Sequence, residues 1–373
     1  MPTVSSTVKS IRKMAGVLRA RTSAIFFDLG SAGTRMCQLR RAPTGMRAVD
    51  ALALDASLLT AATADVPAGC DEQRLGRVVE QGRFSGRDAG LLLPTHAVQF
   101  HTLRLADAVL DQPQGRVVEA VRWEIGRDAR EDGPEIEVRY WRLPPSRQGR
   151  HNLMAVTVRS QDARDWVARF AAAGLHLRHI EPAPCAIVRC AAELWPVQAS
   201  DVWGVIDLGW RQSTLAVVHG STPVYIRPAP ATLEGWSRLV SERLDLGIAE
   251  ASRLLSLHGL TADESGETDS EAAPDAGGSQ GDMSMVLFNL LRDELGSLAR
   301  EVGRCLTYVM AAYPESSVVR IGLAGGGAHI RGLAEYLELQ FSTPVTPVAS
   351  DGPPAVQPTT AGAVGGALLD LED

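Results

Sequence analysis

Long apolar runs, paired cysteines and lysine are all scarce in this chain of 373 residues. No uninterrupted apolar run reaches the roughly 18 residues that a membrane-spanning helix needs, and the N-terminus lacks the apolar core of a signal peptide. The five cysteines form no Cys-x-x-Cys pair, so neither a disulfide framework nor a cysteine metal site is predicted. These absences predict a soluble protein of the reducing cytoplasm. Lysine occurs only at Lys9 and Lys13 whereas arginine is abundant, so an arginine can stand where a related protein has lysine.

Length and charge narrow the class of protein further. The chain is too long for one small domain and suits two lobes, and its hydrophobic content of 45% is enough for real cores although aromatic residues make up only 5%. The net charge of −7 argues against a general nucleic-acid binder, because phosphate binding requires a basic surface.

Two segments stand apart in composition. Residues 1–22 carry Ile11, Met14 and Leu18 at helical spacing among basic residues, which predicts a basic amphipathic arm able to lie on an anionic membrane surface. A frayed, solvated terminus is the alternative. Residues 261–284 are rich in Asp, Glu, Ser and Gly, so we expect a disordered and dispensable loop there.

Hydrophobic periodicity predicts an α/β protein with strands and helices in alternating groups. The expected strands are 24–30, 36–40, 98–105, 137–143, 152–159, 202–208, 215–219, 223–227 and 318–323. The expected helices are 117–127, 162–173, 233–244, 248–257, 284–313, 333–340 and 360–369.

A strand followed by Asp-x-Gly and a hairpin occurs twice, around Asp28 and around Asp207. A glycine-rich hairpin tip lets backbone N–H groups approach a phosphate, and neighbouring hydroxyls add donors. An aspartate at the end of each strand can hold Mg²⁺ through water, since hard cations prefer oxygen ligands. Either copy alone is more often an ordinary β-turn. Together they predict a clamp on one triphosphate, with candidate residues Asp28, Gly30, Ser31, Gly33, Thr34, Asp207, Gly209, Ser213 and Thr214.

A third motif, Gly325-Gly326-Gly327, lies between a buried strand and a helix. Glycines there would allow a flat ring or a sugar to pack on bare backbone, although a glycine turn without ligand is an open alternative.

The order of the three motifs resembles the actin, Hsp70 and sugar-kinase superfamily, whose fold is an α/β, ribonuclease H-like, two-lobed ATPase fold. Within it the chain looks most like the PilM family of type IV pilus assembly proteins, with FtsA a more distant relative. The stretches that carry this resemblance are Leu93-Pro94-Thr95, Glu119–Glu124, Ala172–Leu175, Ile180-Glu181-Pro182 and Ala324–Leu333.

The resemblance implies a division into subdomains. Residues 23–91 and 176–200 would form the first lobe (1A), 92–175 an inserted subdomain (1C), 201–232 and 316–373 the second lobe (2A), and 233–315 subdomain 2B. In PilM-like proteins a groove between the insert and the first lobe receives the N-terminal peptide of the membrane protein PilN. The resemblance therefore implies a cytoplasmic scaffold that associates with the inner membrane through a PilN-like partner and other pilus components, with self-association an option.

The resemblance also assigns roles to single residues. Arg35 would supply the cation for which relatives often use lysine. Glu250 and Arg253 are the substitutes available for the family's contacts to ribose and base, and Glu181 would lie near the attacking water, with a surface turn as its alternative. Because the adenosine side departs from the family pattern, we expect weak ATP–Mg²⁺ binding and little or no hydrolysis. We also expect Val117, Val121 and Trp123 of the insert to face its own sheet.

Two other functions remain open at this stage. A small-molecule kinase of the same superfamily needs an aspartate base in the cleft beyond Asp28 and Asp207, and none is offered by the motifs. An FtsA-like division protein predicts a C-terminal membrane helix, whereas this chain ends in the acidic sequence Leu369–Asp373.

Overall fold

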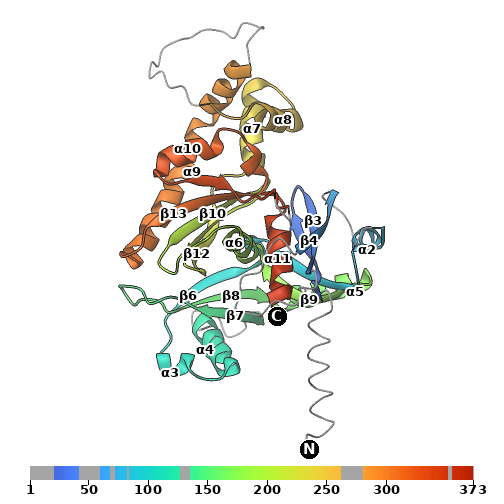
Figure 1. Cartoon of the computed structure of the whole chain (residues 1–373), viewed down its shortest axis with the longest axis vertical. Coiled ribbons are helices and arrows are strands. Elements are labelled where there is room, and N and C mark those ends of the chain that lie inside the picture. Colours follow the sequence, from blue (N-terminus) through green and yellow to red (C-terminus); the bar gives the residue numbers. More distant parts are fainter. Residues whose placement is uncertain are drawn as a thin grey trace, which may run out of the picture.

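The computed structural model describes residues 21–41, 59–67, 72–81, 84–126, 135–261, 280–351 and 355–372. These residues form two large sheets and a smaller third one, each with helices against it (Figure 1). Residues 1–20 of the predicted basic arm, Cys70 and residues 262–279 of the predicted acidic loop lie outside the described residues. The last two residues of the arm, Arg21 and Thr22, form strand β1.

The first sheet has the strand order β1-β3-β2-β5-β9, with β4 paired to β3. Its strands are β1 (Arg21–Thr22), β2 (Ile25–Gly30), β3 (Gly33–Arg41), β4 (Leu59–Pro67), β5 (Asp88–Leu93) and β9 (His176–Pro182). Side chains alternate between its two faces along β2. Phe26 packs with α6 (Ala183–Leu194) and α11 (Ala361–Glu372) on one face. Ile25 and Phe27 pack with α2 (Glu72–Gln81) and α5 (Ser160–Ala172) on the other.

The second sheet has the order β12-β11-β10-β13-β14. Its strands are β10 (Val202–Leu208), β11 (Ser213–His219), β12 (Thr222–Ala229), β13 (Val318–Ala324) and β14 (Val345–Pro347). A core centred on Trp236 and the apolar face of the long helix α9 (Gln280–Ala312) joins the sheet to α7 (Leu233–Leu244), α8 (Ile248–His258) and α10 (Leu333–Phe341). The antiparallel β10–β11 hairpin beside parallel β13 repeats the arrangement of β2, β3 and β5.

The predicted insert contains a small sheet with the order β6-β8-β7 that lies below the second sheet in Figure 1. The whole insert comprises the helices η2 (Thr95–Ala97), α3 (Asp107–Leu110), α4 (Gln114–Gly126) and α5 and the strands β6 (Gln99–Leu103), β7 (Ile136–Arg142) and β8 (Leu153–Arg159). One face packs on α4 through Val117, Val121 and Val138. The other face contributes Val156 to the core of the first sheet.

Every strand and helix that the periodicity predicts is present, with ends that move by a few residues. Periodicity did not predict β1, β4, β5, β9, β14, α2, α3 or α6. Two prolines, Pro182 and Pro184, made the start of α6 look like a loop, but a proline in the first helical turn breaks no hydrogen bond.

Three expectations were wrong. Helix α11, which we grouped with the second lobe, packs on α6 and on β2 and β3 of the first sheet. Residues 280–284 belong to α9 and not to a loop, and Ser284 is buried. Trp123 is 67% exposed, because it lies two residues after Val121 and therefore on the side of α4 away from the face that Val117 and Val121 bury.

Candidate functional site

The two Asp-hairpins meet in one cleft between the lobes, as their duplication predicts. The cleft has a volume of about 460 Å³. Its lining includes nine of the residues that the sequence singled out: Asp28, Gly30, Ser31, Arg35, Asp207, Gly209, Thr214, Gly325 and Gly326.

Strand register explains why charged groups gather there. Arg35 lies directly opposite Asp28 in the β2–β3 hairpin, and Thr214 lies opposite Asp207 in the β10–β11 hairpin. Directly opposed residues of an antiparallel pair project from the same face of the sheet. Each hairpin therefore delivers a carboxylate together with a polar partner to the cleft.

Burial raises the pKa of the Asp28 carboxyl to about 6, while the nearby Arg35 guanidinium acts in the opposite direction. Burial raises the pKa of Asp207 to about 7, the neighbouring Asp28 carboxyl adds to the rise, and Arg35 again opposes it. Two buried carboxyl groups this close together form a site where a bound cation would be favourable, because it would neutralise both.

Direct contacts between the lobes cross this cleft. The Thr95 and Thr214 hydroxyls lie 2.6 Å apart, and His96 Nδ1 lies 2.5 Å from Gln212 Oε1. The Arg211 backbone N–H donates to Ser31 Oγ over 3.2 Å. The hydroxyls of Ser31 and Thr214, which could bind a phosphate, are thus already used in contacts between the lobes.

The glycine loop after β13 approaches the second aspartate closely. Gly325 adopts φ 75°, and a Cβ atom there would lie 2.5 Å from Asp207 Oδ1, so a side chain is excluded. Gly325 and Gly326 line the cleft, whereas Gly327 is buried against Leu208.

Other predicted residues lie behind the cleft or away from it. Thr34 and Ser213 are buried and Gly33 forms the first hairpin turn, and none of the three lines the cavity. Glu250 and Arg253 are exposed on α8 and do not line it either. Four further polar residues line the cleft that the sequence did not single out for it: Thr95, His96, Gln212 and Thr359. The signal for one of them was the Leu-Pro-Thr stretch that ends in Thr95.

The donor set fits the phosphate and cation half of an ATP–Mg²⁺ complex. Asp28 and Asp207 would hold the ion through water, and the hairpin backbones would hold phosphate. The part of the site that would hold the adenine base has fewer matching groups, because Glu250 and Arg253 do not line the cleft. The Leu233 side chain also packs against Gly326, 2.9 Å from where a Cβ atom on that glycine would lie.

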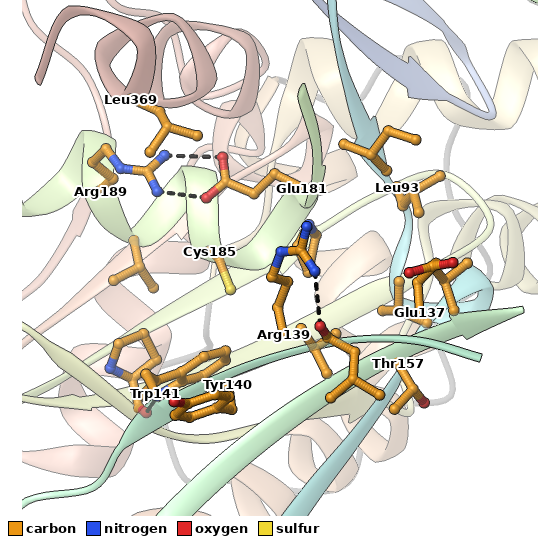
Figure 2. A pocket seen from close by; sticks show the side chains of 18 of the residues that line it. Leu93, Glu137, Arg139, Tyr140, Trp141, Thr157, Glu181, Cys185, Arg189 and Leu369 are labelled. Atoms are coloured by element: carbon orange, nitrogen blue, oxygen red, sulfur yellow. Dashed lines mark hydrogen bonds and ion pairs between the residues drawn. The ribbon is translucent and has the colours of Figure 1, made fainter. Parts of the chain in front are cut away.

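A second and larger cavity, of about 970 Å³, lies between the insert and the first lobe (Figure 2). We call it the insert groove. Its walls come from β7 and β8 of the insert, from α5, and from β9, α6 and the end of α11. Its apolar lining includes Leu93, Val98, Val156, Val158, Ile180 and Val188.

Glu181 lies in this groove and not in the cleft, which corrects its expected place near an attacking water. Its carboxylate forms a bidentate pair with Arg189, with N–O distances of 2.5 and 3.0 Å, and Arg189 also donates to the Gly365 carbonyl. This pair, shown in Figure 2, joins β9 to α6 and α11. A carboxylate engaged in this way is a structural group of the groove wall.

Helix α6 is shared between the two cavities. Ala183 and Ile187 line the cleft, whereas Cys185, Val188 and Arg189 line the groove. The helix therefore forms a common wall between them.

No protein-family model matches this sequence, and no curated protein matches it. Among solved structures, the chain is similar to the PilM–PilN type IV pilus biogenesis complex, with a TM-score of 0.69 and 18% identity over 94% of this chain and 99% of that one. It also matches MreB5 of Spiroplasma citri bound to ADP, with a TM-score of 0.49 and 13% identity over 94% and 95% of the two chains. Among the described helices, none is long and apolar enough to cross a membrane. The chain has the α/β, two-lobed actin-like ATPase fold.

Proposed function

We propose that this protein is a cytoplasmic scaffold of a type IV pilus or related secretion complex of the inner membrane. It binds the N-terminal peptide of a PilN-like membrane protein in the insert groove, and ATP–Mg²⁺ binding in the cleft is weak. The observation that carries the proposal is the insert groove itself, which lies between the insert and the first lobe.

The shape and lining of the groove suit an extended peptide. Strand β9 is the last strand of the first sheet, so its outer edge pairs with no strand among the described residues, and five of its residues line the groove. An exposed strand edge supplies backbone hydrogen bonds, and apolar pockets beside it take alternate side chains. The groove has about twice the volume of the cleft, so it has more room for a peptide.

The cleft gives less support to the kinase alternative. Asp28 and Asp207 are the only carboxylates in its lining as the described residues form it. A kinase needs a further carboxylate beside the acceptor hydroxyl, in addition to those that hold the ion.

The test uses Cys185, whose sulfur points into the groove in Figure 2. Cys185→Trp should fill the groove and abolish binding of a synthetic N-terminal peptide of a PilN-like protein, measured by fluorescence anisotropy. Cys185→Ser changes one atom, so it is the matched control and should bind like the wild type. Thermal unfolding of both variants checks that each is folded. Equal binding by all three proteins, or binding by none at high micromolar peptide, would contradict the proposal.

A further inference from the structure

Arg139 is a cation that faces the insert groove from the middle of strand β7. Alternate residues of this strand lie on opposite faces of the insert sheet, and Ile136, Val138 and Tyr140 pack toward α4. Arg139 therefore faces the groove, directly opposite Val156 of β8. Figure 2 shows its guanidinium group reaching into the cavity.

The other charges of the groove are engaged by partners. Glu181 and Arg189 neutralise each other, and Arg178 pairs with Asp88 of β5 at 2.9 Å. Glu137 accepts a hydrogen bond from Ser160 Oγ over 3.1 Å and lies 3.8 Å from Arg122.

Arg139 forms no ion pair within the described part of the chain. Its guanidinium group donates a hydrogen bond of 2.9 Å to the Val138 carbonyl of the same strand. A guanidinium group has five N–H donors, and water satisfies those that remain while the groove is open. A peptide that fills the groove expels this water among apolar walls, so its own atoms must replace the lost hydrogen bonds. A carboxylate does so with two parallel bonds and also balances the charge, which a backbone carbonyl does not.

We propose that Arg139 sets the specificity of the insert groove by pairing with an aspartate or glutamate side chain of an extended peptide. This inference rests on the groove being a peptide site, as argued above.

The experiment begins with a displayed library of random 12-residue peptides, panned against the full-length protein. Peptides that bind the wild type but not Cys185→Trp are groove-dependent. We expect them to share one acidic position. Arg139→Gln should weaken such a peptide about tenfold or more, the cost of losing a hydrogen-bonded charge pair. Changing the acidic residue of the peptide to its amide should weaken wild-type binding by a similar factor and leave Arg139→Gln unaffected.

Arg142→Gln is the matched control, since Arg142 lies on the same strand but pairs with Asp111 outside the groove. It should leave affinity unchanged. Charge reversal gives a second measurement: Arg139→Glu should select peptides with a basic residue at the same position. A groove-dependent consensus without an acidic position, or equal affinity of wild type and Arg139→Gln, would overturn the role of Arg139 and leave the groove function standing. Failure to obtain any groove-dependent peptide would overturn both.

Discussion

The cleft aspartates should make this protein less stable as pH rises, and Asp207→Asn should remove much of that loss. Burial and the nearby Asp28 raise the pKa of Asp207 from 3.8 to about 7. The folded protein therefore binds this proton more tightly than the unfolded chain does. Between about pH 4 and pH 7 the folded state carries more of this proton, so the free energy of unfolding falls as pH increases through that window.

The size of the effect follows from the same pKa. A rise from 3.8 to about 7 corresponds to about 4 kcal/mol at 1.36 kcal/mol per pH unit. Because Asp207 lines an open cleft and is partly exposed, screening by water reduces the effect, and we expect about 2 kcal/mol. Asp207→Asn should thus exceed the wild type in stability by about this amount at pH 8, and the two should converge toward pH 4.

The assay is urea unfolding followed by circular dichroism from pH 4.5 to 8. Asp293→Asn, a change at an exposed acidic residue of α9, is the control and should retain the pH dependence of the wild type. Mg²⁺ with ADP should narrow the difference at pH 8, since an ion between Asp28 and Asp207 would offset their repulsion. Parallel pH profiles for wild type and Asp207→Asn would refute the reasoning.

Three further predictions concern packing and turnover. Gly365→Ala should lower the free energy of unfolding by about 2–3 kcal/mol, because the new Cβ atom would lie 1.8 Å from the Ala186 carbonyl oxygen where α11 crosses α6. Gly303→Ala is the control: this glycine of α9 faces open space, so the change should raise the free energy of unfolding by about 0.5–1 kcal/mol. In the same denaturation assay, Trp236→Ala should lower the free energy of unfolding by about 3–5 kcal/mol, and Trp123→Ala by less than about 0.5 kcal/mol, because Trp236 is buried and Trp123 is exposed. Similar losses for the two variants would contradict this. Steady-state ATP hydrolysis should stay below about 1 s⁻¹ in a phosphate-release assay, and faster turnover that disappears in Asp207→Ala would show that the cleft is catalytic.

Local patterns in the sequence were sufficient to predict most of the strands and helices and the shared cleft. The alternation along β2 and the Asp-x-Gly hairpins depend on neighbouring residues only, so they can be recognised in one dimension. The duplication of the hairpin motif added the long-range information, because two like units of one fold are expected to face each other. The insert over residues 92–175 was expected only from the family resemblance and not from these patterns.

Tertiary structure alone decided where the remaining side chains act. Glu181 lies in β9, and only the packing of α6 beside this strand brings Arg189 to its carboxylate and places it in the groove. Helix α11 lies far from β2 in the sequence and packs on it because its glycines allow a close approach to α6 and Phe26. Such contacts depend on shape and distance between segments that are remote in the chain, and no local pattern encodes them.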